Sequence, residues 1–480
     1  MKTLTAATLC AIAALLASGS ARAAEYGVTE DMGKASPAWI LQTVQDLGMT
    51  RNVVSLGFDP SDPGLLPQQD EIDALVALAP AYGVEIGIAV YQRRAGSLST
   101  PANLAEFSTW LGNAARRWPT VRTWIAPNEP NQPRFWQPQF TAACVNASGR
   151  AYFRAQAAMY DALKTTNAAN QIVGVALSPR GNDNCRAASN VSTSPVRFLQ
   201  SIGAAMRASR RNRPIMDALS QHPYPLLNTQ GPAVGYRWPN IGVANMDRLK
   251  QAFWDAFDGT AQPTFEDGLQ VYLDELGWQT DSPGDVYQGL ENVPVIDQAT
   301  QGRYYAQAVR MAACDPSVAA LNFFHLVDED VRDRFQSGVL WADGTRKDSF
   351  VPVQTAILRA RDGGCAGLPV TWRHTTGVVK ATASFGGRGR LRRVTVRAEE
   401  DATYTAAVVP AGSTRTSIGR MLASSSAFRG VRGTVKAYRA PVARIPVSLG
   451  PGRYVTAVRV AAATNPARTT VLVGAPYTLR

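Results

Sequence analysis

The stretch VRTWIAPNEPNQ, residues 121–132, joins an apolar run to a group of polar residues. Its first part, residues 121–127, is rich in β-branched and aromatic side chains, which indicates a buried strand. Glu129 follows this run directly, between Asn128 and Pro130. A carboxylate in this place is either a functional group at a strand end or a charge where the strand leaves the core. The pattern of the surrounding chain decides between these two interpretations.

Seven further runs of the same kind occur, and each is followed by a longer amphipathic stretch. The eight strand candidates are residues 25–29, 51–58, 85–91, 121–127, 171–177, 216–222, 269–275 and 318–324. Apolar residues spaced three and four apart in the stretches after them predict helices. Eight alternating strands and helices within residues 24–365 predict an α/β fold, a (β/α)8 TIM barrel. An open doubly wound sheet is the alternative, but no G-x-G-x-x-G turn follows the first strand.

The character of the chain changes after Cys365. Residues 366–480 contain short, mostly period-two β-rich runs separated by Gly, Pro and Ser, which predict a small antiparallel β-sandwich domain. This part holds 18 Lys+Arg against 3 Asp+Glu, whereas the whole chain of 480 residues has a net charge of +12. The basic charge therefore belongs to the C-terminal domain, and it indicates either a contact with an acidic polymer or a solubilising charged face.

Residues 1–23 have the features of a secretory signal peptide. Lys2 precedes a short apolar stretch, and Ala21, Arg22 and Ala23 form a cleavage triplet. No later segment has the roughly 18 consecutive apolar residues that a transmembrane helix requires. We therefore expect a secreted, extracellular protein without a transmembrane segment.

Four cysteines remain after the predicted signal peptide, and an oxidising compartment favours two disulfides. Cys144 and Cys185 lie in loops that follow strands, at the C-terminal face of the predicted barrel. Cys314 and Cys365 lie at helix C-termini, on the opposite face. Because a disulfide joins Cα atoms about 5.5 to 6 Å apart, the topology predicts the pairs 144–185 and 314–365.

Two glutamates stand at the ends of predicted strands, where a (β/α)8 barrel carries its functional groups. Glu129 ends the fourth strand, and Glu275 ends the seventh in the stretch VYLDELGW, residues 271–278. Hydrolysis of a glycosidic bond needs one carboxyl group to protonate the leaving oxygen and a second to attack or stabilise the anomeric carbon. Strand ends that face each other across the barrel mouth can supply this pair.

The chain resembles the clan A glycoside hydrolases in three motifs. Asn128–Glu129–Pro130 is similar to the acid/base motif of the clan, and Glu275–Leu276–Gly277–Trp278 is similar to its nucleophile motif. His222–Pro223–Tyr224 after the sixth strand is similar to the H-x-Y element between them. The resemblance covers residues 25–365 and is nearest to glycoside hydrolase family 39 and to related family 5 endoglycosidases.

The resemblance implies a role for each of these residues. Glu129 would be the general acid and then the general base, and Glu275 the nucleophile of a retaining reaction, with the carboxyl groups about 5 to 5.5 Å apart. Asn128 would bind the sugar 2-hydroxyl, and Tyr224 would donate a hydrogen bond to Glu275. His222 would contact substrate or tune Glu129, although a buried histidine satisfied by the backbone is the alternative.

Asp274, next to Glu275, competes for the role of nucleophile. Adjacent residues of a strand point to opposite sides, so alternation allows only one of the two carboxylates to face the barrel mouth. The resemblance selects Glu275.

Aromatic rings near strand ends are candidates to stack on sugar rings. We expect Trp278, Trp136 and Tyr91 to contact substrate. His325 follows the eighth strand, where family 5-like members carry a tryptophan, and we expect it to contact substrate too. The second strand also lacks the arginine that many clan members carry, so both departures leave the identity of the sugar open.

The sequence thus predicts a secreted retaining glycoside hydrolase that degrades a poly- or oligosaccharide and needs no cofactor and no metal. We expect no nucleic-acid partner. Two other classes of function stay open: a non-catalytic carbohydrate-binding protein on a glycosidase scaffold, and a cell-surface protein whose basic domain anchors it to a polymer.

Overall fold

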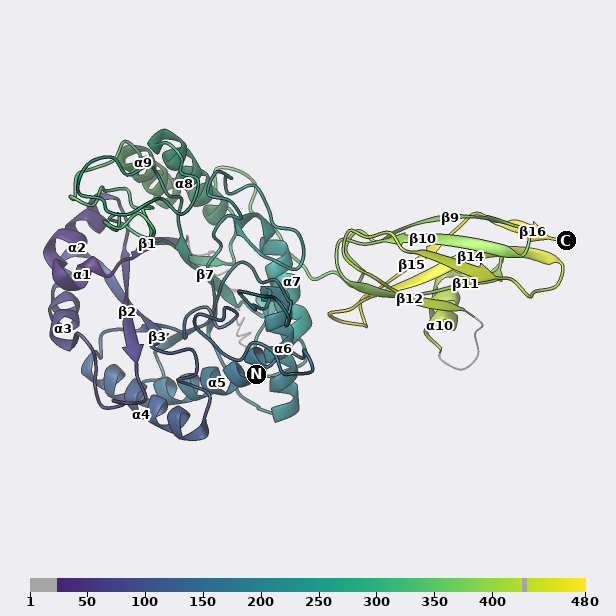
Figure 1. Cartoon of the computed structure of the whole chain (residues 1–480), viewed down its shortest axis with the longest axis horizontal. Coiled ribbons are helices and arrows are strands. Elements are labelled where there is room, and N and C mark those ends of the chain that lie inside the picture. Colours follow the sequence, from purple (N-terminus) through teal and green to yellow (C-terminus); the bar gives the residue numbers. More distant parts are fainter. Residues whose placement is uncertain (1–23, 425–429) are drawn as a thin grey trace, which may run out of the picture.

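The computed structural model describes residues 24–424 and 430–480. The predicted signal peptide, residues 1–23, lies outside the described residues. The chain forms an eight-stranded barrel surrounded by helices and, beside it, a β-rich C-terminal domain (Figure 1). Among the described residues, no helix is long and apolar enough to cross a membrane.

Eight parallel strands close into the barrel in sequence order, which confirms the predicted fold. The strands are β1 (Glu25–Thr29), β2 (Arg51–Phe58), β3 (Glu85–Gln92), β4 (Thr123–Ile125), β5 (Gln171–Leu177), β6 (Ala218–Gln221), β7 (Gln270–Leu276) and β8 (Val318–Phe323). Strands β4 and β6 are shorter than their predicted runs. His222, the last residue of the predicted sixth run, therefore begins a loop at the barrel mouth, and Glu129 lies in the loop after β4.

A ring of helices packs around the barrel (Figure 1). It consists of α1 (Met32–Ala35), α2 (Pro37–Asp46), α3 (Gln69–Leu78), α4 (Pro101–Arg117), α5 (Ser148–Thr166), α6 (Pro195–Ser209), α7 (Met246–Phe257), α8 (Gln298–Ala313) and α9 (Phe350–Gly363). Short 3-10 turns η1 (Ala79–Tyr82), η2 (Val243–Asn245) and η3 (Phe265–Asp267) join some of them to strands. The large hydrophobic cluster lies between this ring and the outer side of the strands.

The barrel interior is filled by a separate small cluster. Its buried members come from strands β2 to β8 and are mostly small or β-branched: Val53, Ala89, Ile125, Val173, Ala176, Ala218, Tyr272 and Ala320. At the N-terminal end of the barrel, Arg51 donates to Thr123 Oγ1 at 2.9 Å and pairs with Glu25 and Glu85. The interior is therefore a packed core, and functional groups are left to its C-terminal end.

The C-terminal domain consists of two antiparallel sheets that pack around a shared core. One sheet has the order β13-β10-β9, from β13 (Val442–Pro446), β10 (Leu391–Arg397) and β9 (Thr382–Arg388). The other joins β12 (Val431–Val435), β11 (Ala402–Pro410), β14 (Gly452–Ala462) and β15 (Thr469–Val473), and β16 (Tyr477–Leu479) pairs with β14. Helix α10 (Arg415–Ala423) packs on the second sheet. This arrangement is the β-sandwich that the period-two runs predict.

Both disulfides that the topology predicts are present. Cys144, in the loop between β4 and α5, is bonded to Cys185 in the loop between β5 and α6, with Cα atoms 5.4 Å apart. Cys314, directly after α8, is bonded to Cys365, with Cα atoms 4.5 Å apart. The first bond joins two loops at the barrel mouth, and the second closes the end of the helical ring.

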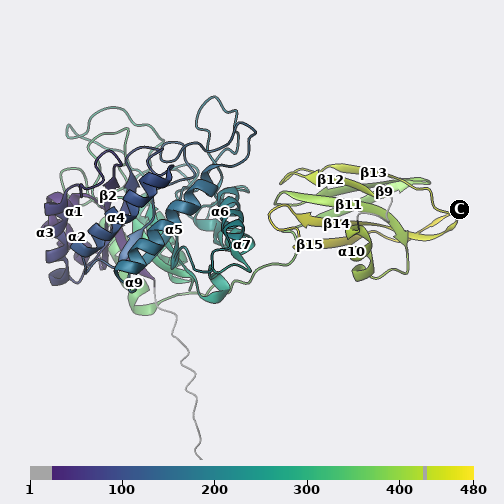
Figure 2. The same cartoon turned by 90° about the horizontal axis from the view of Figure 1, so that it is seen from below.

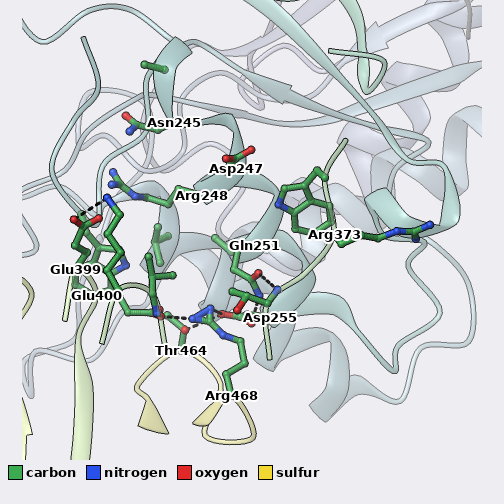
Figure 3. A pocket seen from close by; sticks show the side chains of 18 of the residues that line it. Asn245, Asp247, Arg248, Gln251, Asp255, Arg373, Glu399, Glu400, Thr464 and Arg468 are labelled. Atoms are coloured by element: carbon green, nitrogen blue, oxygen red, sulfur yellow. Dashed lines mark hydrogen bonds and ion pairs between the residues drawn. The ribbon is translucent and has the colours of Figure 1, made fainter. Parts of the chain in front are cut away.

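A buried group of charges connects the barrel to the C-terminal domain on the side of α7 (Figure 2). Arg468, only 2% exposed, forms ion pairs with Asp255 of α7 and with Glu400 (Figure 3). Thr464 donates to Asp255 Oδ2 at 2.8 Å. A cavity of about 530 Å³ lies beside these groups, and Glu129 and Glu275 are not among the residues that line it.

Loss of Arg468 should destabilise the protein. In Arg468→Ala, Asp255 and Glu400 would remain buried without their shared cation, and breaking a buried ion pair in this way costs about 3–5 kcal/mol of unfolding free energy. Urea denaturation followed by circular dichroism measures the change. Arg453→Ala, which removes an exposed arginine of the same domain, is the control. Equal denaturation midpoints for the two variants would show that the buried charges do not stabilise the fold.

Candidate active site

Polar side chains at the ends of β4, β6 and β7 meet at the C-terminal end of the barrel. Glu129 follows β4, His222 follows β6, and Glu275 lies in β7. Because all strands are parallel and closed into a ring, their carboxyl ends meet around one mouth. The structure therefore brings together residues that are far apart in the chain. Glu129 lies 93 positions before His222, and His222 lies 53 positions before Glu275.

The imidazole of His222 lies between the two glutamates. Its Nδ1 is 3.2 Å from Glu129 Oε1 and 3.3 Å from Glu275 Oε2. One carboxylate oxygen of Glu129 and one of Glu275 lie within 4.8 Å of each other. For comparison, the carboxyl groups of inverting glycosidases lie roughly 6.5 to 9.5 Å apart and those of retaining ones about 5 to 5.5 Å apart.

Two tyrosines fix the carboxylate of Glu275. Tyr91 donates to Oε1 at 3.1 Å, and Tyr224 donates to Oε2 at 3.1 Å, the contact that the resemblance implies. Burial, followed by the charge of Glu275, raises the pKa of both tyrosines well above the usual value. Both hydroxyls therefore stay protonated and act as donors at neutral pH.

The pKa of Glu275 rises to about 7. Burial is the main cause, and the charges of Glu129 and Asp274 add to it, while His222 and the hydrogen bond from Tyr224 lower the pKa. A carboxyl group in this state exchanges its proton near neutral pH, which is a property of groups that take part in acid–base chemistry.

His222 is completely buried and still carries a raised pKa. Burial alone would lower the pKa of an imidazole, but the charges of Glu275 and Asp274 outweigh burial and hold it well above the usual value. The hydrogen-bonded backbone environment that was the alternative for His222 is not what surrounds its ring. The ring nitrogens face three carboxylates, and we expect an imidazolium at neutral pH.

Asp274 also reaches this group of residues. Its Oδ1 accepts a hydrogen bond from Ser220 at 2.7 Å, and its Oδ2 is 3.6 Å from His222 Nε2. The prediction that only one of the two carboxylates faces the barrel mouth is therefore wrong, because both Asp274 and Glu275 contact His222. The ladder between β7 and β8 shifts register between Leu273 and Leu276, and this irregularity breaks the period of two.

A second irregularity positions Glu129. Its backbone has φ +35°, a value that costs energy for a residue with a side chain, and its N–H donates to Ala176 O at 2.9 Å. Ala176 itself has φ +51° and lies in the register shift between β5 and β6. The bulge of β5 thus turns a carbonyl toward Glu129 and holds it in the strained conformation.

The loop after β4 is anchored on both sides. Asn131, fully buried, donates through Nδ2 to Ser178 O at 3.1 Å and accepts from Ser178 N–H at 2.9 Å. Gln92 Nε2 donates to Asn128 O at 3.0 Å. Among the described residues, the side-chain amide of Asn128 has no hydrogen-bond partner, and the residue is 6% exposed. These bonds anchor the loop, and that amide is left free to bind another molecule.

The structure contradicts the prediction that Trp136 and Trp278 stack on sugar. Trp136 is 1% exposed and packs edge-on against Tyr152. Trp278 is 0% exposed, packs against Tyr305 and donates to Gln230 O at 2.8 Å. Their faces are covered by protein, because the loops after β4 and β7 fold back over the helices and use these rings as their own core.

Other aromatic rings lie around the carboxylates instead. Phe324 and His325 follow β8, and their ring centroids are 3.7 Å apart. Phe335, 36% exposed, packs edge-on against Phe324 at 4.9 Å and lies 6.0 Å from Tyr224. His325 Nδ1 is 3.0 Å from Thr29 O, which fixes its ring. The sequence pattern missed Phe335, because it lies twelve residues beyond Phe323, the last residue of β8.

Asp31 is a further acidic residue near the end of β1 that is not among the candidates predicted from the sequence. It follows the first strand, so the rule of polar strand ends could have found it. Its carboxylate accepts from Ser55 N–H at 2.8 Å and pairs with buried Lys34 at 2.9 Å, yet remains 51% exposed. After burial and Glu275, its charge contributes to the raised pKa of Tyr91.

Glu129, His222 and Glu275 are also close enough to one another to share a cation. An imidazole must lose its proton before it can bind a metal, and the neighbouring carboxylates favour the protonated form of His222. A cation bound to His222 would have to displace that proton.

Comparison with solved structures supports the fold. The chain superposes on a family 39 glycoside hydrolase from Bacteroides cellulosilyticus WH2 with a TM-score of 0.51 and 14% sequence identity, over 89% of this chain and 81% of that one. The chain resembles a clan A glycoside hydrolase. A family 5 subfamily 18 protein from Bifidobacterium longum subsp. infantis matches with a TM-score of 0.47 and 13% identity, over 74% of this chain and 81% of that one. No protein-family model matches the sequence, and a sequence comparison with curated proteins gives no match.

Proposed function

We propose that the protein is a secreted retaining glycoside hydrolase that acts on a poly- or oligosaccharide. The observation that carries the proposal is the approach of two carboxylates to within 4.8 Å at the barrel mouth, on the two strands where clan A places its catalytic pair. Such a separation suits direct attack by one carboxylate on the sugar, with no room for a water molecule between them.

Glu275 is the nucleophile in this proposal. Its two oxygens are held by Tyr91 and Tyr224, so the carboxylate cannot rotate away from the anomeric carbon. In the first step an oxygen of Glu275 forms a bond to the anomeric carbon while the bond to the leaving oxygen breaks. The product of this step is a glycosyl ester of Glu275 and a leaving group that needs a proton.

Glu129 supplies that proton. Its side chain is 15% exposed against 9% for Glu275, and it is not held by tyrosines, so its second oxygen is accessible to the leaving group. In the second step Glu129 takes a proton from water, the hydroxide attacks the anomeric carbon, and Glu275 leaves as a carboxylate. Glu129 ends protonated, as it began.

His222 acts as a positioning residue. Its Nδ1 faces Glu129 and Glu275 at nearly equal distances, so an imidazolium there offsets part of the repulsion between the two carboxylates. The contact with Asp274 holds the other side of the ring. The charge on His222 lets two acidic groups share a buried site.

The substrate contacts follow from groups left free at the mouth. The free amide of Asn128 is placed next to Glu129 and would bind the sugar 2-hydroxyl. Phe324, His325 and Phe335 offer ring surface beside Tyr224 for stacking on a sugar.

The predicted signal peptide and the two disulfides support secretion, and the basic C-terminal domain supports contact with an acidic polymer.

Replacement of either glutamate should abolish turnover with the fold retained. Glu275→Gln removes the attacking oxygen, so no activity should remain on any aryl glycoside or polysaccharide that the wild type cleaves. Glu129→Gln removes the proton donor and should lower kcat by about 10² to 10⁴, with a smaller loss for leaving groups that need no proton. Glu71→Gln, an exposed glutamate of α3, is the control. Native activity in Glu275→Gln would remove Glu275 from the mechanism.

The pH profile should reflect the ionisation of Glu275. Because Glu275 must be ionised to attack and its pKa is about 7, kcat/KM should fall as the pH drops below about 7. Tyr224→Phe removes a hydrogen bond that favours the carboxylate, so this acidic limb should move to higher pH. Tyr305→Phe, which removes a buried hydroxyl bonded to Ser337 O, should leave the limb in place. Undiminished kcat/KM in the wild type at pH 5 would contradict the assignment.

A further inference from the structure

The acidic residues of the C-terminal domain are gathered at one place. The only three acidic residues of residues 366–480 are consecutive, Glu399–Glu400–Asp401. All three are paired with cations: Glu399 with Lys380, Glu400 with Arg468, and Asp401 with Lys436 at 2.9 Å. The described arginines of strands β9, β10 and β13 form no ion pair with these three residues.

Four of these arginines lie on one side of the β13-β10-β9 sheet, and we call this side the arginine face. Arg388 ends β9, Arg393 and Arg397 belong to β10, and Arg444 belongs to β13. All four are exposed. The alternate residues of the same strands are buried in the sandwich core: Val394, Val396, Ala443 and Ile445. The arginines therefore point away from the core.

Arg393 and Arg444 face each other directly across the β10–β13 ladder. Like charges in such a cross-strand pair, with Cβ atoms about 4.5 to 5.5 Å apart, destabilise a sheet. On its other side Arg393 is paired with Gly386, which offers no side chain to neutralise it. Among the described residues, neither guanidinium has an ion-pair or hydrogen-bond partner. An anion bound between the two arginines would remove the repulsion.

The arginine face is also open, whereas the opposite side of the domain is covered. Ile418 and Leu422 of α10 pack on Ala407 and Val409 of the other sheet. Figures 1 and 2 show α10 on the side of the domain away from β9. A side chain added at Gly386, in the middle of the arginine face, would meet nothing within 4 Å. The face is accessible to a large ligand.

We propose that the arginine face binds an anionic polysaccharide through its carboxylate groups. A planar guanidinium binds a carboxylate with two parallel hydrogen bonds, and Arg393 with Arg397 extends the row along β10 over about 13 Å. The outward positions of β9, β10 and β13 carry no aromatic side chain, so the face lacks the rings on which single-stranded nucleic acids stack. The choice of a polysaccharide rests on the proposed glycosidase activity of the same chain.

The test measures binding of the full chain to sodium polygalacturonate by isothermal titration in dilute buffer. Arg393→Gln/Arg444→Gln should weaken binding at least about tenfold, because each charge-assisted bond contributes more than 1.4 kcal/mol. Added NaCl should weaken wild-type binding as the Debye length falls from about 30 Å at 0.01 M to about 10 Å at 0.1 M. Arg388→Gln/Arg397→Gln is a second pair on the same face and should weaken binding too.

Arg415→Gln/Arg420→Gln is the matched control, because it removes the same charge from exposed positions of α10. It should leave the affinity within about twofold of the wild type. If the control lost as much affinity as the face variants, the binding would depend on net charge alone, and the proposal of a specific face would be overturned. Unchanged affinity in both face variants would overturn it as well. Tighter binding to a single-stranded oligonucleotide or to phosphatidylglycerol vesicles than to polygalacturonate would overturn the polysaccharide assignment.

Hydrolysis of a small aryl glycoside is measured on the same samples. The face variants should retain it, because β9 and β10 lie in the C-terminal domain, apart from the barrel strands (Figure 1). Binding without any hydrolysis by the wild type would reject the glycosidase proposal and leave the arginine face intact. Hydrolysis by the wild type without binding to polygalacturonate would overturn the proposal for the arginine face and leave the glycosidase proposal intact.

Discussion

The closed ring of eight parallel strands is the constraint on which the candidate site depends. Closure places every strand's carboxyl end around one mouth, and it fills the space below with small interior side chains. Glu129, His222 and Glu275 come within contact distance only because β4, β6 and β7 are held in this ring. Glu275 is buried at this mouth, and its burial is the main cause of its raised pKa.

Two acidic groups in a buried mouth would repel each other without a cation. His222 supplies that charge, and Tyr91 and Tyr224 supply neutral donors that stay protonated. The two tyrosines hold Glu275 alone, whereas His222 contacts both glutamates, and this asymmetry is the physical basis for assigning attack to Glu275 and proton transfer to Glu129. The C-terminal domain is joined to the barrel by a different buried cation, Arg468, and keeps its arginine face open.

The strands and the carboxylate pair could be predicted from the sequence, because β-rich runs and polar strand ends are local signals. The burial of Trp136 and Trp278 could not, since it depends on how long loops fold back over the helices. Register shifts at Ala176 and Leu273 carry no sequence signal either, yet they aim Glu129 and bring Asp274 toward His222. Asp328 begins the charged run DEDVRDR, residues 328–334, yet it is buried and pairs with Lys347 at 2.7 Å.

The central claim is that Glu129 and Glu275 form a double-displacement pair. The most direct test follows the first-formed product by proton NMR, in the minutes before mutarotation, on any glycoside that the protein cleaves. Two displacements at the anomeric carbon return the sugar to its starting configuration, so the product should have the same anomeric configuration as the substrate. An inverted product would mean that water attacks directly, and it would contradict the role assigned to Glu275.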